Sequence, residues 1–531
     1  MGKVGKLVRD RDGNFAMMTA VLSVPLVIAA GVALDLATIS RYKSELQHAI
    51  DAATLAVARE GKGITDAEAQ KIADLFVTNN LDPQYTKMAV VREGTTVSVQ
   101  AETRAPMAFG ALLGYDDYPV TAAASADTAY TSYEITLVLD TTGSMKGGKL
   151  AAMKDAVNGM IDSMAAQVSD KNKLRFALVP FSTFVNVGPD NGPKFDKDGR
   201  QIAGSGAKWL DLKGESPVAQ SELSTGVSRF QLFSNLGQQW GGCVETRTPG
   251  GRNYDVSNAL ADTTKPESLY VPAFAIDEPD SGGYANSYIA SGVDPLDDST
   301  AARRQKWAKY GVATEADGTP LFGGALVDGR DLLGLGNIDR IAIDGGASGP
   351  FGFARGPNHG CSSQPILPLT NDYSTVKSKV NALQAEGTTN IAEGVAWGTR
   401  VLTPGEPFAQ AQDRKKVGVE KILIVLTDGA NVLGVNNSGL RSGYSSYGYL
   451  IDGRLGTDSG SAASTNALMN DKTAAACEYA KEDGIIVYTI RLEEPDVKTG
   501  TMLQQCATSE GHYFDAPSRS QLDDVFQTIK D

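Results

Sequence analysis

An uncharged, apolar run near the N-terminus is the first clear pattern in the chain. Residues 13–34, GNFAMMTAVLSVPLVIAAGVAL, contain no Asp, Glu, Lys or Arg. As a helix they would extend about 33 Å at roughly 1.5 Å per residue, enough to cross a hydrocarbon core about 30 Å thick. Pro25 is compatible with this, because neighbouring groups in membrane helices satisfy the carbonyl that a proline leaves free. We therefore predict a single N-terminal transmembrane helix.

The charges beside this run predict its orientation. Four basic residues precede it: Lys3, Lys6, Arg9 and Arg11. Asp35 follows it directly, so the positive-inside rule places the N-terminus in the cytoplasm and the chain after residue 40 on the other side. A cleaved signal peptide is the alternative, but its apolar core is shorter, at roughly 7–15 residues. Helical periodicity continues past the run, through Ile39, Tyr42, Leu46, Ala49, Ala53 and Ala56. We predict a retained anchor in residues 1–40.

Strand-like and helix-like patterns alternate in the remainder of the chain. Residues 61–130 contain period-two alternation, at Val97, Val99 and Ala101 and again from Val120 to Ala126, which predicts a small connecting module with strands. Later apolar runs predict strands at Ile135–Leu139, Leu174–Phe181, Ile422–Leu426 and Ile485–Ile490. Helices are predicted from Leu150 to Met164, over Tyr373–Ala385 and Ile391–Leu402, within Thr465–Lys481 and from Ser520. This order predicts an α/β fold with a doubly wound, mostly parallel sheet.

The alternation of strand and helix patterns is interrupted between Asn186 and Gln364. A structureless loop of this length is improbable in a compact domain, so we predict an inserted subdomain over residues 186–364. The sheet domain would then consist of residues 131–185 and 365–531. A second irregular stretch, Val432–Ser464, follows the third predicted strand and is expected at the ligand edge of the sheet.

Composition narrows the class of protein. The 531 residues include 49 Lys+Arg and 63 Asp+Glu, a net charge of −14, which argues against nucleic-acid binding. The four cysteines form no C-x-x-C pair, which argues against a zinc ribbon, and an even number suits pairing in an oxidising, exported compartment. Three connectivities are open. Cys243 and Cys361 both lie in the predicted insertion, and Cys477 and Cys506 flank the last predicted sheet strand, so we predict those two disulfides.

Polar residues at the predicted strand ends are the candidate chemistry. Asp140, Thr142 and Ser144 follow the first strand and Asp428 follows the third, while Thr389 lies in a polar turn before a helix. Ligands of open parallel sheets bind beyond the carboxyl ends of the strands. Two carboxylates and three hydroxyls form an all-oxygen set that suits a hard divalent cation, Mg²⁺ first, with Mn²⁺ or Ca²⁺ as alternatives.

This pattern resembles the metal-ion-dependent adhesion site of von Willebrand factor A domains. The family pattern is Asp-x-Ser-x-Ser, then a distant Thr, then a distant Asp. Asp140, Thr142 and Ser144 match the first element, with Thr in place of the middle Ser, Thr389 matches the second, and Asp428 in LTDG matches the third. The resemblance implies a Rossmann-like von Willebrand A fold in which the metal accepts a carboxylate from a protein partner.

A second resemblance covers residues 12–60, including GNFAMMTAVLSVPLVIAAGVALDLATISRYKSELQHAIDAATLAVA. This segment is similar to the N-terminus of TadE/TadG-like proteins of tight-adherence (Flp) pilus assembly. The stretches WGGCVETR, GPNHGC and CATSEGHYFDAPS also look like TadG-type sequence. The resemblance implies a single-pass protein of the bacterial inner membrane, facing the periplasm, that binds other pilus-assembly components and is not an enzyme.

Three other functions are also compatible with the sequence. One is a structural pilin-like subunit whose sheet domain is only a cap. Another is a P-loop-like NTPase, because Gly143–Lys149 fits G-x-x-x-x-G-K, although Leu150 stands where Ser or Thr should hold Mg²⁺. The third is an aspartic protease, although an extra Thr separates Asp140 from Thr142-Gly143. The chain has three histidines, and it contains no G-x-S-x-G or H-E-x-x-H motif to support hydrolytic catalysis.

Overall fold

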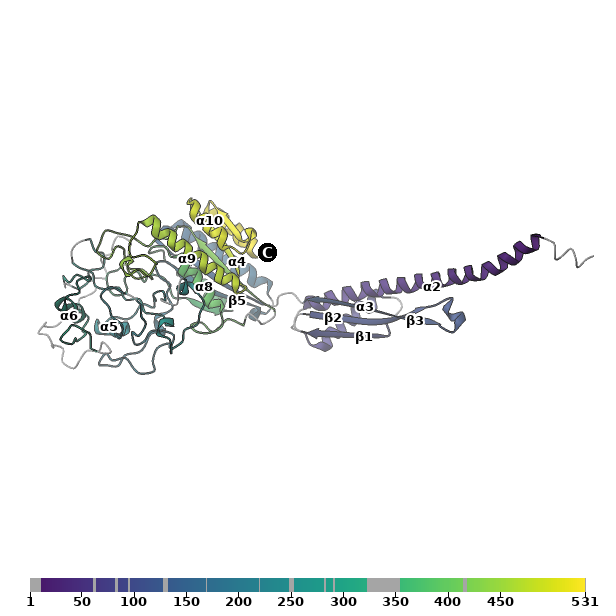
Figure 1. Cartoon of the computed structure of the whole chain (residues 1–531), viewed down its shortest axis with the longest axis horizontal. Coiled ribbons are helices and arrows are strands. Elements are labelled where there is room, and N and C mark those ends of the chain that lie inside the picture. Colours follow the sequence, from purple (N-terminus) through teal and green to yellow (C-terminus); the bar gives the residue numbers. More distant parts are fainter. Residues whose placement is uncertain are drawn as a thin grey trace, which may run out of the picture. The chain divides into compact units, whose positions relative to one another are not determined.

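The protein forms two compact units, Met1–Thr131 and Ser132–Asp531, which are described separately. The computed structural model (Figure 1) describes residues 11–60, 64–81, 85–93, 96–127, 132–168, 170–218, 220–247, 253–280, 283–289, 292–321, 354–413 and 418–530. Lys3, Lys6 and Arg9 of the predicted cytoplasmic tail lie outside these residues.

The first unit consists of one long helix, a short helix and a three-stranded sheet. Its elements are α2 (Arg11–Glu60), α3 (Asp66–Asn80), β1 (Lys87–Glu93), β2 (Thr96–Pro106) and β3 (Asp117–Asp127). The strands pair antiparallel in the order β1-β2-β3. The last part of α2 packs on the sheet, where Leu46, Ile50 and Val57 share a core with Val97 and Val99. The predicted helical and strand periodicities in this region are therefore confirmed.

The first part of α2 is the apolar run. Figure 1 shows α2 extending well past the strands of its unit. Apart from Gly31 and Asp35, residues 17–36 of this helix are exposed, among them Val21, Leu26 and Leu34. In the described part of the chain, α2 is the one helix long and apolar enough to cross a membrane. The prediction of an N-terminal apolar helix is confirmed, and its retention and orientation stay predictions.

The second unit is built on a six-stranded sheet. Its strands are β4 (Ser132–Asp140), β5 (Leu174–Phe181), β6 (Leu367–Thr370), β7 (Val419–Thr427), β8 (Ile486–Leu492) and β9 (Tyr513–Ala516). The order across the sheet is β6-β5-β4-β7-β8-β9. All neighbours are parallel except β5 and β6. The predicted α/β fold with a mostly parallel sheet is confirmed.

Helices cover both faces of this sheet. One face packs on α4 (Gly148–Gln167), α7 (Tyr373–Asn381) and α11 (Leu522–Lys530), and the other on α8 (Ile391–Leu402), α9 (Ala462–Glu482) and α10 (Val497–Cys506). Strands that are buried on both faces read as continuous apolar runs, which is why β4, β5 and β7 were predictable. The four-residue strands β6 and β9, and α10 with its central Gly500, were not predicted, because they are short or carry no clear apolar periodicity.

The segment between β5 and β6 shares a core with the sheet. It contains the helices α5 (Arg229–Asn235) and α6 (Thr300–Lys309), several 3₁₀ turns and long irregular stretches. Trp209, Phe230 and Trp307 from this segment belong to the same apolar cluster as Val138 of β4. This segment and the sheet fall in one compact unit. That residues 186–364 form a subdomain of their own stays a prediction.

Both predicted disulfides are present. Cys243 is bonded to Cys361, and Cys477 to Cys506, so all four cysteines are paired. The second bridge joins α9 to α10 beside β8. The first joins two parts of the segment between β5 and β6 that are 118 residues apart in sequence.

We expect the Cys243–Cys361 bridge to stabilise the protein more than the Cys477–Cys506 bridge. The two bridges join residues 118 and 29 positions apart, and the conformational entropy that a bridge removes from the unfolded chain grows with the logarithm of loop length. The chain-entropy relation gives the longer loop an advantage of about 1 kcal/mol in the free energy of unfolding. Urea unfolding of the two Cys→Ser double variants, followed by tryptophan fluorescence, measures this difference. A larger loss for the Cys477/Cys506 variant would contradict it.

Candidate metal centre

The candidate site lies at the carboxyl edge of two neighbouring parallel strands. β4 pairs with β7 in a register that places Leu139 opposite Leu426. The following residue of β4 is Asp140, and two residues after Leu426 comes Asp428. The strand pairing therefore brings together two carboxylates that are 288 positions apart in the sequence, by the difference of their numbers.

Four of the five predicted residues are linked by hydrogen bonds. The Thr142 amide donates to Asp140 Oδ1 over 2.8 Å. The Thr142 and Ser144 hydroxyls are 2.9 Å apart, and the Ser144 hydroxyl donates to Asp428 Oδ1 over 2.6 Å. Asp140, Thr142 and Asp428 are buried, whereas Ser144 is exposed. The series of contacts thus connects two buried carboxylates through the exposed Ser144.

Thr389 approaches the same place from a separate loop. The Gly143 amide donates to the Gly387 carbonyl over 3.0 Å, which joins the loop after β4 to the turn before α8. A Cβ atom built on Gly429 would lie 3.6 Å from Ser144 Oγ and 3.7 Å from Thr389 Oγ1. Gly429 thus leaves space between these two hydroxyls that another residue would fill. All five predicted residues lie in this one region of the sheet edge.

Two further residues of the site were missed from the sequence. Lys149, at the start of α4, donates from Nζ to Asp428 Oδ2 over 2.7 Å, and the Asp428 side chain in this ion pair is fully buried. Glu494 follows β8, and its Oε2 would lie 4.0 Å from a Cβ on Gly429. In the sequence, Lys149 stands out only as the last residue of the G-x-x-x-x-G-K pattern. The signal for Glu494 is its position just after a strand that ends at the same edge.

Asp140 is the electrostatically strained member of the pair. Its Oδ2 accepts a hydrogen bond from the Thr427 hydroxyl over 2.6 Å. Burial first, and then the nearby Asp428 carboxylate, raise the pKa of Asp140 to about 6, and the hydrogen bonds from Thr427 and Thr142 oppose this rise. Like charges that share a buried site disfavour the ionised form of one of them. A cation held by these residues would offset this penalty.

The donor chemistry fits a divalent cation. The set has two carboxylates and three hydroxyls, and Mg²⁺ prefers such oxygen ligands together with water. In the described part of the chain, no three His, Cys, Asp or Glu side chains are grouped so that they could hold a metal ion. Hydroxyls therefore have to complete any ligand set here. The Lys149 ammonium already supplies one positive charge to Asp428, which marks the position as favourable for a cation.

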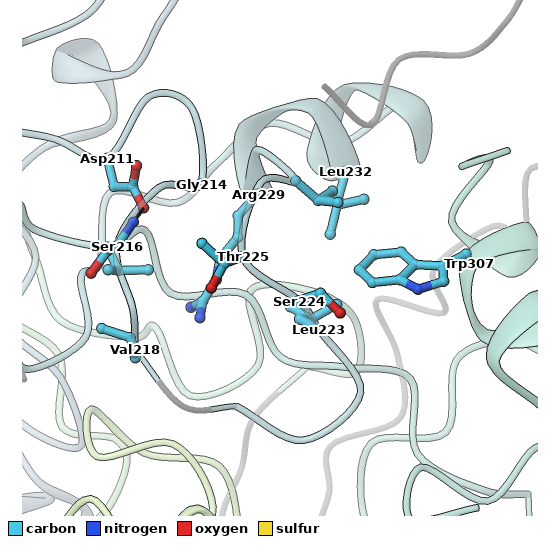
Figure 2. Close-up of a pocket in the computed structure, with 12 residues that line it drawn as sticks. Asp211, Gly214, Ser216, Val218, Leu223, Ser224, Thr225, Arg229, Leu232 and Trp307 are labelled. Atoms are coloured by element: carbon cyan, nitrogen blue, oxygen red, sulfur yellow. Dashed lines mark hydrogen bonds between the residues drawn. The ribbon is translucent and has the colours of Figure 1, made fainter. Parts of the chain in front are cut away.

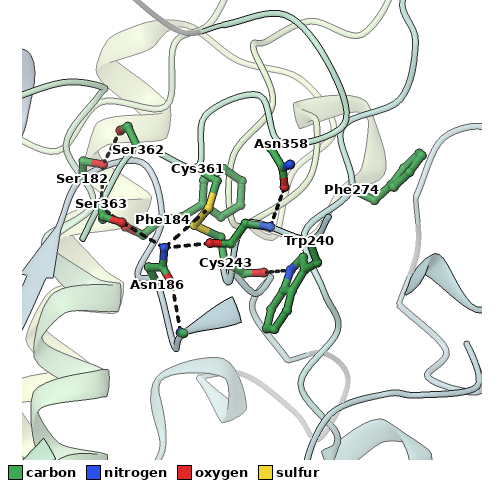
Figure 3. The surroundings of a disulfide bond; sticks show 12 residues. Ser182, Phe184, Asn186, Trp240, Cys243, Phe274, Asn358, Cys361, Ser362 and Ser363 are labelled. Atoms are coloured by element: carbon green, nitrogen blue, oxygen red, sulfur yellow. Dashed lines mark hydrogen bonds between the residues drawn. A yellow bond between two sulfur atoms is a disulfide. The ribbon is translucent and has the colours of Figure 1, made fainter. Parts of the chain in front are cut away.

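The Cys243–Cys361 disulfide supports the loops beside the site (Figure 3). Asn186, shortly after β5, donates from Nδ2 to the carbonyls of Gly241 and Ser363 over 2.9 and 3.0 Å. The Thr388 amide, next to Thr389, donates to the Thr183 hydroxyl over 3.0 Å. The stretch after β5 that contains Thr183 and Asn186 therefore connects the loops around the bridge with the turn that carries Thr389.

A small cavity lies elsewhere, in the segment between β5 and β6 (Figure 2). It has a volume of about 20 Å³ and is lined by Asp211, Ser216, Arg229 and Trp307, among others. Arg229 is paired with the Glu245 carboxylate over 2.7 Å. A cavity of this size holds about one water molecule, so it offers no room for an organic ligand.

One segment of the chain is similar to a known family of pilus-assembly proteins. Residues 13–60 match the family model for TadE/G-like Flp pilus-assembly proteins. A search of curated proteins finds no match to the chain. The match to the family model covers the apolar run and the rest of α2, so residues 13–60 are TadE/G-like.

Several solved structures of pilus proteins are similar at low identity. They are the von Willebrand factor domain of the type V pili tip protein Mfa5 from Porphyromonas gingivalis (10% identity, 76% of this chain, 95% of that chain, TM-score 0.32), the PilB minor pilin from Streptococcus sanguinis (12%, 84%, 77%, 0.30) and the pilus adhesin SpaC from Lactobacillus rhamnosus GG (11%, 84%, 33%, 0.30). The chain spans about a third of the length of SpaC. At these TM-scores the similarities define neither the fold nor the site.

We expect Asp140 to make the stability of the metal-free protein depend on pH. Its pKa is about 6 in the folded chain and near 3.8 in the unfolded chain, so the folded state binds more protons between these values. Stability should therefore fall as the pH rises from about 4 to about 6. Relative to the wild type, Asp140→Asn should gain up to about 3 kcal/mol in unfolding free energy across this window.

Urea unfolding in EDTA at several pH values between about 4 and 7 measures this effect. Asp162→Asn, at a mostly exposed carboxylate on α4 that pairs with Lys377, is the matched control and should follow the wild type. Parallel pH profiles for the wild type and Asp140→Asn would contradict the assignment.

Proposed function

We propose that this chain is a membrane-anchored pilus-assembly or adhesion protein whose sheet domain, a von Willebrand A domain, binds a protein partner through a divalent cation. The observation that carries the proposal is the hydrogen-bonded series Asp140, Thr142, Ser144 and Asp428 at the carboxyl edge of β4 and β7. The TadE/G-like segment at residues 13–60 supports the pilus setting.

Asp140, Thr142, Ser144, Thr389 and Asp428 would hold the cation, with Mg²⁺ as the first choice and Mn²⁺ or Ca²⁺ as alternatives. A bound divalent cation supplies a Lewis-acid position at which an acidic side chain of the partner binds. Ser144 is exposed while both aspartates are buried, so the partner would approach from the side of Ser144.

The setting follows from α2. Its apolar part would cross the bacterial inner membrane with the N-terminus in the cytoplasm, because Arg11 and the basic residues before it precede the apolar run. The part of the first unit after residue 40 and the whole second unit would then lie in the periplasm. Two disulfides are consistent with an oxidising compartment of this kind. The partners would be other pilus-assembly components and a protein that presents an acidic group.

We expect the purified protein to bind Mg²⁺ or Mn²⁺ with one site per chain. Isothermal titration calorimetry measures this binding. Ser144→Ala and Asp428→Asn should each weaken it by about tenfold or more, because the first removes an oxygen ligand for the cation and the second removes a negative charge. The control Asp162→Asn should bind like the wild type. A folded wild-type protein without divalent binding up to millimolar concentrations would refute the metal site.

We expect Lys149→Met to strengthen cation binding. Lys149 must leave Asp428 when a metal takes its place, and a hydrogen bond to a charged group is worth about 1.5–3 kcal/mol. Replacement by Met should therefore lower the dissociation constant for Mg²⁺ by about tenfold. The matched control is Lys154→Met, which is also on α4 but donates to the carbonyls of Asn381 and Leu383. Weaker binding by Lys149→Met would show that the ammonium supports the site instead of competing for it.

A structural pilin-like role is the second candidate. The observation in its favour is that Lys149 and Ser144 already donate hydrogen bonds to Asp428, so this carboxylate has partners without a metal. Replacing both Asp140 and Asp428 by Ala separates the two functions. Loss of divalent-dependent partner binding with the fold intact supports adhesion, whereas normal pilus assembly by this variant favours a cap. An NTPase would require ATP binding or hydrolysis by the purified protein.

A further inference from the structure

The turn between β2 and β3 is tied to α2 where the apolar run ends. The carboxylate of Asp35 accepts hydrogen bonds from the amides of Ala108, Phe109 and Gly110, over 2.8, 3.2 and 2.7 Å at the shortest. Asp35 is buried by these contacts, although its neighbours Leu34 and Leu36 are exposed. A carboxylate beside an apolar phase is costly unless it is hydrogen-bonded, and here backbone amides provide those bonds.

The same turn reaches into the apolar run itself. A Cβ atom on Gly31 would lie 2.2 Å from Cδ2 of Phe109, so only glycine allows the ring to pack this closely on the helix. Gly31 and Asp35 are one helical turn apart, and they are the buried residues of α2 between Met17 and Arg41. The turn therefore overlies the last turn of the segment expected to cross the membrane.

The tip of the turn is apolar and exposed. Residues 105–115, APMAFGALLGY, contain no charged residue. Leu112, Leu113 and Tyr115 are 77, 71 and 67% exposed, and Tyr118 on β3 is half exposed. Monomeric soluble proteins rarely group large apolar side chains on a protruding turn without a binding role, and Tyr is enriched where proteins meet the membrane interface.

We propose that the apolar part of the β2–β3 turn, residues 107–115, inserts into the interface of the membrane that α2 crosses and acts as a second anchor. This inference rests on the proposed membrane span. It is favoured over contact with a second copy because residues 108–110, directly before the tip, contact α2 at Gly31 and Asp35, beside the exposed Leu34 and Leu36. The turn would fix the first unit close to the bilayer and limit how far it tilts.

Site-specific fluorescence in the full-length protein tests this. All four native cysteines are in disulfides, so a single introduced cysteine can carry an environment-sensitive dye such as NBD. The protein is reconstituted into phosphatidylcholine–phosphatidylglycerol vesicles that contain spin-labelled lipids. Three separate labels are compared: Leu113→Cys in the turn, Val91→Cys on β1 as an exposed control outside the turn, and Leu22→Cys within the apolar run of α2.

We expect the Leu113→Cys label to be quenched by a shallow spin label at least about twofold more than the Val91→Cys label, because the tip enters the interface. The Asp35→Ala substitution should reduce quenching at position 113 while leaving quenching at position 22 unchanged, since it releases the turn and not the span. This split identifies Asp35 as a positioning residue for the turn.

Other outcomes overturn the inference in distinguishable ways. If Leu22→Cys is quenched but Leu113→Cys is as accessible to aqueous iodide as Val91→Cys, the span is correct and the second anchor is wrong. If Leu113→Cys is shielded from iodide but not quenched by lipid, and dilution with lipid exposes it, a second copy covers the turn. If Leu22→Cys itself is not quenched, the proposed membrane span fails.

Discussion

Parallel pairing of β4 with β7 is the constraint on which the site depends. It forces two carboxylates to the same edge of the sheet, one of them completely buried. Unbalanced, such a pair would oppose folding, because burial and mutual repulsion both disfavour the ionised forms. The surrounding residues balance it in two ways: Thr142 and Thr427 donate hydrogen bonds to Asp140, and the Lys149 ammonium pairs with Asp428.

A third carboxylate shows a different solution to the same problem. Asp35 is satisfied by three consecutive backbone amides, which cannot leave without breaking the β2–β3 turn. Asp428 is satisfied mainly by side chains, Ser144 and Lys149, which can rotate away. The first arrangement is a permanent tie between a helix and a turn. The second can be exchanged by rotation of side chains, which the proposed cation site requires.

The fold and most of the site were predictable because each depends on a local pattern. The buried strands β4, β5 and β7 are uninterrupted apolar runs, and a parallel sheet brings their carboxyl ends to one edge, so Asp140 and Asp428 could be placed together without a structure. The ion pair of Lys149 with Asp428 could not be predicted, because it depends on where α4 begins after the turn at Gly147, which has a positive φ of 88°.

The packing of the β2–β3 turn on α2 could not be predicted from the sequence for a related reason. APMAFGALLGY has neither helical nor strand periodicity. Its position is defined by contacts with Gly31 and Asp35, more than seventy positions earlier by residue number. The disulfides were easier, because the position of each cysteine relative to the predicted strands already favoured the two observed pairs. Long-range side-chain contacts, unlike strand pairing, leave no periodic trace in the sequence.

Charge arithmetic at the sheet edge favours a divalent over a monovalent ion. With Lys149 in place, one positive charge faces two carboxylates. Burial of Asp140 first, and then the nearby Asp428 carboxylate, raise the pKa of Asp140 to about 6. A monovalent ion that displaced Lys149 would only substitute one unit charge for another and would gain little. A divalent ion at the proposed site would neutralise both carboxylates and would compensate for the lost ion pair. In the proposed site, Lys149 would thus exclude monovalent ions from Asp428, and it would pair with this carboxylate when no divalent ion is bound.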